Sequence, residues 1–224
     1  MMLERNEDIH SVVFFDTGWE FPEMHEHINR LERYTGLDFV RLQSRHSFDY
    51  WRSERQFKPR PGNKSGIGYG WPNPLRRWCT RQKMDTINRY RKANSGHTQC
   101  IGFALDEAKR CESAGVQGSR FPLVEYEVTE SEALQYCRDR GFDWGGLYDI
   151  FGRVSCFCCP LSGIRGMRKL RKHRPELWAR ILEMDKASPS HNRGFIGYET
   201  AHDLEQRFQN EDAQLTLWKE RSHA

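Results

Sequence analysis

The N-terminal part of the chain constrains the fold more than any other segment. Ser11-Val12-Val13-Phe14-Phe15 is a short, continuous apolar run of β-forming residues that ends at the turn signal Asp16-Thr17-Gly18. Residues 23–34 then show apolar side chains at helical spacing, and residues 38–42 form a second apolar run. Strand, helix and strand in this order predict an α/β fold with a parallel sheet and a right-handed crossover. We expect the first strand to be central and buried.

The rest of the chain continues the alternation. We expect strands over residues 99–104 and 121–126 and a long loop over 53–75, which is rich in proline and glycine. Helices are expected over 78–92, around Asp106, over 129–140, 162–184 and 200–211, the third opened by the capping box Thr129-Glu130-Ser131-Glu132. This pattern predicts an α/β domain over residues 1–160 and a helical C-terminal extension over 161–224.

Composition excludes several classes of protein. Apolar residues make up 37% of the chain and charged residues 29%, which is typical of a soluble globular protein. No apolar run reaches the ~18 residues of a transmembrane helix, and the N-terminus has no signal-peptide core. The seven cysteines are an odd number and three of them crowd together, unlike a secreted disulfide framework. We therefore expect a cytoplasmic protein with free thiols, a metal site or redox chemistry.

Charge is distributed unevenly. Residues 1–50 carry a net charge of −5, residues 51–125 a net charge of +9, and residues 126–224 are balanced. A basic middle segment suggests an anionic ligand, although a solvated basic face would have the same composition. The run between Gly163 and Pro175 could contact nucleic acid through phosphates, but a solvated helix face is the favoured interpretation. Its cations are Arg165, Arg168, Lys169, Arg171, Lys172 and Arg174.

Three short constellations could carry chemistry. Asp16-Thr17-Gly18 follows a predicted strand, and ligands of open α/β sheets bind where strands end, although an ordinary turn needs the same residues. Residues 76–83 place four cations and the Cys79 thiol at a predicted helix start, where anions bind and thiol pKa values fall; a basic surface helix is the alternative. Residues 156–159 contain three cysteines, with C-x-x-C spacing typical of metal or redox sites.

Taken in order, these segments resemble the phosphoadenosine phosphosulfate (PAPS) reductase family. Residues 12–23, with Asp-Thr-Gly and then Phe-Pro-Glu, resemble one family block, and residues 68–83 resemble the next, with Arg77-Trp78-Cys79-Thr80 and Lys83. Residues 102–110 resemble the strand–helix block with Asp-Glu and a later Arg, and residues 156–160 resemble a closing C-x-x-C-P. The resemblance implies the adenine-nucleotide α-hydrolase-like fold, a parallel sheet of about five strands with helices on both faces.

The resemblance also implies roles for individual residues. It assigns nucleotide binding to seven residues, the catalytic positions to Cys79 and Lys83, and a suspected 4Fe–4S cluster to Cys79, Cys156, Cys158 and Cys159. The nucleotide-binding residues would be Asp16, Thr17, Gly18, Arg77, Asp106, Glu107 and Arg110. The implied substrate is an adenine nucleotide, ATP or PAPS, and the implied function is reduction of a sulfonucleotide or sulfur transfer. A thioredoxin-like reductant would be the partner.

Several positions depart from the family pattern. Trp78 and Ala104 stand where many reductases have Cys and Arg, and no cysteine follows Cys159. The family's Ser-Gly-Gly-x-Asp-Ser phosphate loop is absent from the sequence, so we expect weak adenine-nucleotide binding, since that loop supplies backbone N–H groups to phosphates. Two further functions remain open: a nucleic-acid-associated sulfur-transfer component, of the DNA phosphorothioation or phage-defence type, and a non-catalytic remnant of the fold.

Overall fold

The computed structural model describes residues 1–58, 61–62, 66–113, 117–186 and 194–222. Contacts group the chain into two compact units. The strand unit contains residues 1–15, 22–42 and 84–148, and the cysteine unit contains residues 16–21, 43–83 and 149–224. These units interleave along the chain, whereas the boundary predicted at residue 160 divides it once; that boundary stays a prediction.

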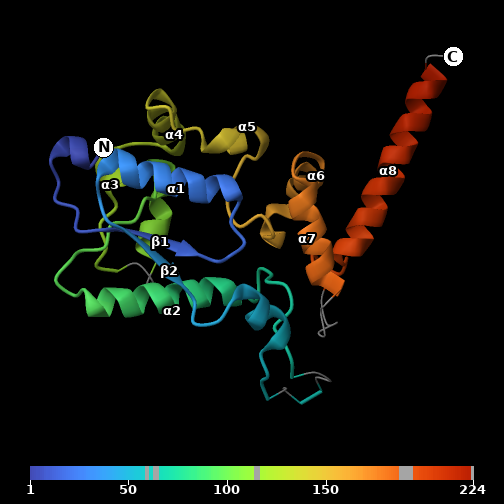
Figure 1. The fold of residues 1–224 in the computed structure, drawn as a ribbon, viewed down its shortest axis with the longest axis horizontal. Coiled ribbons are helices and arrows are strands. Elements are labelled where there is room, and N and C mark those ends of the chain that lie inside the picture. The colour runs from blue at the N-terminus through green and yellow to red at the C-terminus, as the bar shows by residue number, and fades with distance from the viewer. Residues whose placement is uncertain (59–60, 63–65, 114–116, 187–193, 223–224) are drawn as a thin grey trace. The chain divides into compact units, whose positions relative to one another are not determined.

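The strand unit is built on the predicted strand–helix–strand opening. Strands β1 (Val12–Asp16) and β2 (Phe39–Gln43) are parallel neighbours, connected by helix α1 (Pro22–Thr35). The Val12 N–H donates to the Asp38 carbonyl at 2.9 Å, which aligns the two strands. Figure 1 shows α1 on one side of the strand pair and α2 (Trp78–Ala93) on the other. The fold is α/β with helices on both faces of a parallel sheet, as predicted.

Short helices complete the strand unit. Helix α4 (Glu130–Asp139) begins where the capping box predicts, because the Thr129 side chain and Glu132 satisfy each other's backbone N–H groups. The expected helix around Asp106 is a 3-10 helix over Leu105–Glu112. Further 3-10 turns cover Leu3–Arg5 and Trp144–Gly146, and α5 spans Leu147–Ile150.

Two predicted strands are wrong. Residues 122–125 form helix α3 (Pro122–Glu125), because Pro122 occupies its first turn, where a missing N–H costs nothing. Residues 99–104 form only an isolated parallel bridge between Cys100 and Arg120. Within the described ranges β1 therefore pairs with β2 alone, so β1 is not the central strand that we expected.

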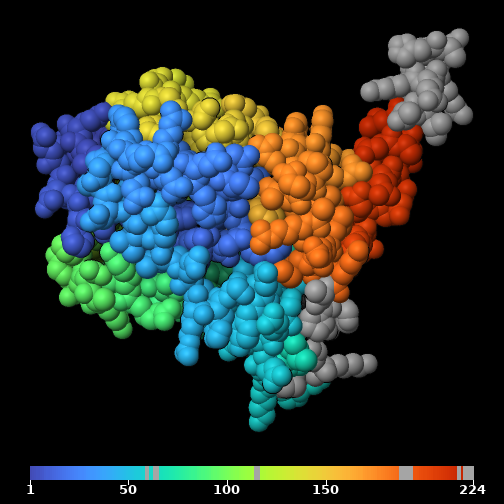
Figure 2. Space-filling view, viewed as in Figure 1, coloured from blue at the N-terminus to red at the C-terminus, as the bar shows by residue number. Residues whose placement is uncertain are grey.

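Helices also dominate the cysteine unit. A π-helical turn covers Tyr50–Glu54, a 3-10 turn covers Pro160–Ser162, and α6 (Gly163–His173), α7 (Pro175–Lys186) and α8 (Ala201–Ser222) follow. The helix expected over 162–184 is split, because Pro175 lacks the N–H that would continue α6. Helix α8 runs on beyond the expected end at residue 211. Figure 2 shows the atoms of α6 and α7 in orange beside those of α8 in red.

The core of this unit is aromatic and aliphatic. Buried side chains of α6, α7 and α8 meet one another, and they are Met167, Leu170, Leu177, Trp178, Ile181, Ala201, Leu204 and Phe208. In the part of the chain that the structure describes, none of the helices combines the length and the hydropathy that crossing a bilayer requires.

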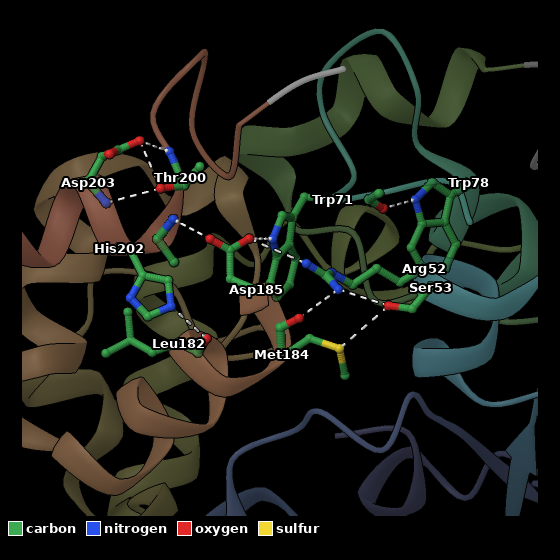
Figure 3. A network of polar contacts seen from close by, with 12 residues as sticks. Arg52, Ser53, Trp71, Trp78, Leu182, Met184, Asp185, Thr200, His202 and Asp203 are labelled. Atoms are coloured by element: carbon green, nitrogen blue, oxygen red, sulfur yellow. Dashed lines mark hydrogen bonds and ion pairs between the residues drawn. The ribbon is translucent and has the colours of Figure 1, made fainter. Parts of the chain in front are cut away.

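A buried ion pair ties the segment before α2 to the end of α7 (Figure 3). Arg52 is completely buried and its guanidinium lies 3.3 Å from Asp185 Oδ1 while donating to the Met184 carbonyl at 2.9 Å. Trp71 Nε1 donates to the same Asp185 oxygen at 2.7 Å, and the Ala201 N–H donates to the other at 2.8 Å. One carboxylate thereby joins α7, the first residue of α8 and the glycine-rich loop.

Candidate functional site

The segment Asp16-Thr17-Gly18 forms a self-bonded turn at the end of β1. The Gly18 N–H donates to Asp16 Oδ1 at 2.7 Å, and the Trp19 N–H donates to Thr17 Oγ1 at 3.1 Å. Gly18 has a φ of 78°, a conformation that favours glycine. Gln43 Nε2 donates to the other oxygen of Asp16 at 3.1 Å. Hydrogen bonds within the turn and from Gln43 therefore orient the side chains of Asp16 and Thr17.

The cysteine segment docks onto this turn. Thr17 Oγ1 lies 3.4 Å from Cys156 Sγ and donates to Glu20 Oε1 at 2.9 Å. The Cys156 thiol donates to the same Glu20 oxygen at 3.4 Å, and the Phe157 N–H donates to the Trp19 carbonyl at 3.0 Å. The predicted nucleotide turn and the predicted cluster residues thus meet, although 139 positions separate Thr17 from Cys156.

The four predicted cluster thiols lie within one electrostatic neighbourhood. Burial raises the pKa of Cys79, and the nearby Cys159 raises it further. Burial also raises the pKa of Cys158, which is 1% exposed, with further contributions from Cys156 and Cys159. The pKa values of Cys156 and Cys159 are raised as well, first by burial. As free thiols, all four are therefore held in the protonated form.

We tested this donor set against the metal centre that the resemblance implies. Thiolates are the soft ligands that iron and zinc take in proteins, so the chemistry of the four side chains fits. Their arrangement does not enclose an ion: among the described residues no three His, Cys, Asp or Glu side chains are placed to hold one. We therefore route no reaction step through a metal.

Two residues at this turn were missed by the sequence reasoning. Arg180 of α7 donates to the Gly18 carbonyl at 3.1 Å, and its guanidinium carbon lies 4.1 Å from the centre of the Trp19 ring. Glu20 bridges Thr17 and Cys156, as described above. Glu20 lies inside the quoted motif and could have been found there, whereas no local signal marks Arg180, which is 162 positions from Gly18.

The remaining predicted site residues are placed as follows. Arg77 and Lys83 belong to the cysteine unit and are exposed, and the charge of Arg77 acts against the burial-driven rise in the pKa of Cys159. Asp106, Glu107 and Arg110 belong to the strand unit, and they form polar contacts within that unit. Asp106 accepts a bond from the Glu130 N–H at 3.1 Å, and Arg110 forms an ion pair with Glu107.

Comparison with known families covers both the turn and the cysteine segment. The model of the phosphoadenosine phosphosulfate reductase domain matches residues 1–161. The chain belongs to this family. The PAPS reductase domain thus contains the whole strand unit and the four cysteines Cys79, Cys156, Cys158 and Cys159, and helices α6, α7 and α8 lie beyond the match.

Curated relatives of this PAPS reductase family protein come from Methanocaldococcus jannaschii. The uncharacterized protein MJ0066 is 24% identical over 178 residues, which are 75% of this chain and 34% of that protein. The uncharacterized protein MJ0973 is 22% identical over 186 residues, which are 78% of this chain and 41% of that protein. The chain therefore spans less than half the length of the curated relatives it matches. No solved structure matches it.

Proposed function

We propose that this chain is an enzyme of sulfur chemistry that acts on an adenylylated sulfur species such as adenylyl sulfate or PAPS. The carrying observation is the 3.4 Å contact between Thr17 of the nucleotide turn and Cys156 of the thiol cluster. Membership of the PAPS reductase domain family supports the substrate class. In this proposal the nucleotide lies against the Asp16–Gly18 turn, and the thiols face the sulfur end of the substrate.

The cations of the cysteine unit would bind the phosphosulfate group. Arg77, directly before α2, and Lys83, in its second turn, have exposed side chains, and Arg180 reaches the Asp16–Gly18 turn from α7. Guanidinium groups suit the oxygens of phosphate and sulfate, because they donate paired hydrogen bonds. For Asp106, Glu107 and Arg110, a role in nucleotide binding stays an expectation from the family resemblance.

The proposal gives the four cysteines two alternative roles, as iron ligands or as reactive thiols, and metal analysis distinguishes them. If iron is bound, Cys79, Cys156, Cys158 and Cys159 would be its ligands. If the protein is free of metal, Cys79 is the attacking thiol. Its sulfur then bonds to the sulfate sulfur as the bond from that sulfur to the bridging oxygen breaks. The nucleoside phosphate leaves with the proton that the Cys79 thiol gives up, and Cys79 is left as an S-sulfonate. A dithiol reductant of the thioredoxin class then supplies two electrons and releases sulfite.

The first experiment is binding and metal analysis on the full chain. AMP, adenylyl sulfate and PAPS are titrated by calorimetry, and iron and acid-labile sulfide are measured on anaerobically purified protein. We expect weak but measurable binding of the sulfonucleotides. Iron with acid-labile sulfide would assign the four thiols to a cluster, and a protein free of both would assign Cys79 to the attack on the substrate. A protein that binds none of the three nucleotides would contradict the proposal and favour the non-catalytic alternative.

A matched pair of variants locates the chemistry. Cys156→Ser removes a thiol that contacts the turn, whereas Cys100→Ser removes an exposed thiol of the strand unit. We expect Cys156→Ser to lose iron, or sulfite release with a dithiol reductant, and Cys100→Ser to retain both. Equal loss in the two variants would contradict a role for the 156–159 segment.

A further inference from the structure

A second candidate site lies in the strand unit, on the C-terminal half of α2. A hollow of about 720 Å³ is lined there by residues between positions 85 and 97. Arg89, Arg91, Lys92 and His97 contribute to its wall, and Asp85 brings the one negative charge among the lining residues that the structure describes. The hollow is therefore basic, and none of its residues was assigned to the PAPS reductase chemistry.

The cations of this hollow lack acidic partners, in contrast to others in the same unit. Arg41 pairs with Glu32, Arg120 with Glu7 and Glu125, and Arg140 with Glu4. Within the described ranges neither Arg89, Arg91 nor Lys92 forms an ion pair, and the only side-chain bond of Arg89 goes to Thr86 Oγ1. Three cations against the single carboxylate of Asp85 leave an excess of positive charge in the hollow, which favours an anionic ligand.

In the other basic helix, α6, several cations are already paired. In α6, Arg168 pairs with Glu211, and Arg171 pairs with Glu205 and Asp212, all of α8. Lys169 donates to the Ile150 carbonyl at 2.6 Å. Three of the six cations that the sequence suggested as a possible nucleic-acid surface are thus engaged with other elements of the cysteine unit: Arg168, Lys169 and Arg171.

An exposed pair of imidazole rings adjoins the hollow. His97, a lining residue, stacks on His10 with ring centroids 3.8 Å apart and planes 8° from parallel, and both residues are exposed. Flat, exposed aromatic rings beside a basic groove are the two elements with which proteins bind unpaired bases and their phosphates. A duplex keeps its bases stacked on one another and would leave such rings unused.

We propose that this hollow binds single-stranded nucleic acid, with Arg89, Arg91 and Lys92 on the phosphates and the His10–His97 pair against a base. A strand that carries a phosphate at every nucleotide matches three cations spread over a helix face better than one isolated anion does. The site is independent of the cysteine cluster, so its test does not depend on the proposed sulfur chemistry.

The test is fluorescence anisotropy with labelled single strands of about 20 nucleotides, the scale of a few single-strand site lengths. We expect binding whose logarithmic salt slope is roughly −2, since three phosphate contacts on a single strand contribute about 0.7 each. Arg89→Glu/Lys92→Glu is expected to weaken binding by at least about tenfold and to flatten the slope. The matched control, Arg33→Glu/Lys109→Glu, reverses two exposed cations of the same unit that do not line the hollow. It is expected to change the dissociation constant less than about twofold.

Further measurements establish which kind of ligand the hollow binds. His97→Ala should weaken single-strand binding without changing the salt slope, because it removes a stacking ring and no phosphate contact. Inorganic phosphate at matched ionic strength should not displace the strand. The proposal is overturned by equal losses in the two charge-reversed proteins, by tighter binding of the matching duplex, by displacement with free phosphate, or by no binding of single strands at low salt. If the reversed protein fails to fold, Arg89→Gln/Lys92→Gln is measured in its place.

Discussion

Arg52 and Asp185, 133 positions apart, form an ion pair in which the arginine is completely buried. Burial lowers the pKa of Arg52 to about 10, and the Asp185 carboxylate acts in the opposite direction. The guanidinium also lies 4.1 Å from the centre of the Trp71 ring. A buried charge of this kind destabilises the fold when its counter-charge is removed.

Asp185→Ala should destabilise the protein severely. It leaves the Arg52 charge buried without a counter-charge, and such losses amount to about 3–5 kcal/mol of unfolding free energy. Urea unfolding monitored by tryptophan fluorescence measures the change. Arg52→Met/Asp185→Leu should recover part of the loss, because it removes both charges. Glu199→Ala, which breaks an exposed pair with Arg207, is the control and should cost at most about 1 kcal/mol.

Gly68→Ala should also destabilise the cysteine unit. Gly68 has a φ of 63°, and a Cβ there would lie 2.3 Å from the Arg52 carbonyl oxygen. Backbone atoms cannot move away as a flexible side chain can, so we expect a loss of at least about 2 kcal/mol. Gly62 also has a positive φ, but a Cβ there would meet no atom within 4 Å. Gly62→Ala therefore measures the cost of the backbone conformation alone, without the steric clash. Equal effects of the two variants would contradict the close approach.

Stability should fall in mild acid because of His27. Burial lowers the pKa of His27 from its ordinary 6.5 to about 4, where the ring packs against Phe142 and Trp144. The unfolded chain then binds the extra proton between these pH values and the folded protein does not. The contribution is therefore fully present above pH 6.5 and is lost as the pH falls toward 4, by about 3 kcal/mol in all. His27→Phe should reduce this slope in unfolding measured at several pH values. An unchanged slope would show that other groups cause it.

Thiol reactivity should differ strongly between cysteines. Cys100 is exposed, whereas Cys158 is 1% exposed with a pKa raised well above its usual value. A thiol reagent followed by peptide mass analysis should modify Cys100 at least about 100-fold faster, because Cys158 reacts only after local opening. Denaturant should abolish the difference. Rapid modification of Cys158 in the folded protein would contradict the burial of the cluster.

Local signals predicted much of the strand unit. The apolar run before Asp16, the helical spacing of residues 23–34 and the capping box at Thr129 each act through neighbours within a few residues, and each formed as expected. Two predictions of secondary structure failed at positions where a single proline changes the local structure. Pro122 begins a helix inside an apolar run, and Pro175 divides a continuous helical pattern. Both effects depend on a missing N–H, which periodicity does not register.

The sequence by itself also determined the family, and it indicated the candidate residues, which are the Asp16–Gly18 turn and the thiols of Cys79 and of the 156–159 segment. Only the tertiary structure decided which of them meet. Glu20 bridges Thr17 and Cys156, and Arg180 reaches Gly18. Acids of α8 pair with Arg168 and Arg171 of α6, whereas none of the residues that the structure describes forms an ion pair with Arg89, Arg91 or Lys92 of α2. Contacts between residues more than 100 positions apart arise from the packing of whole elements, which local sequence patterns do not specify. Whether a charged side chain is neutralised depends on an opposite charge lying beside it in the folded protein.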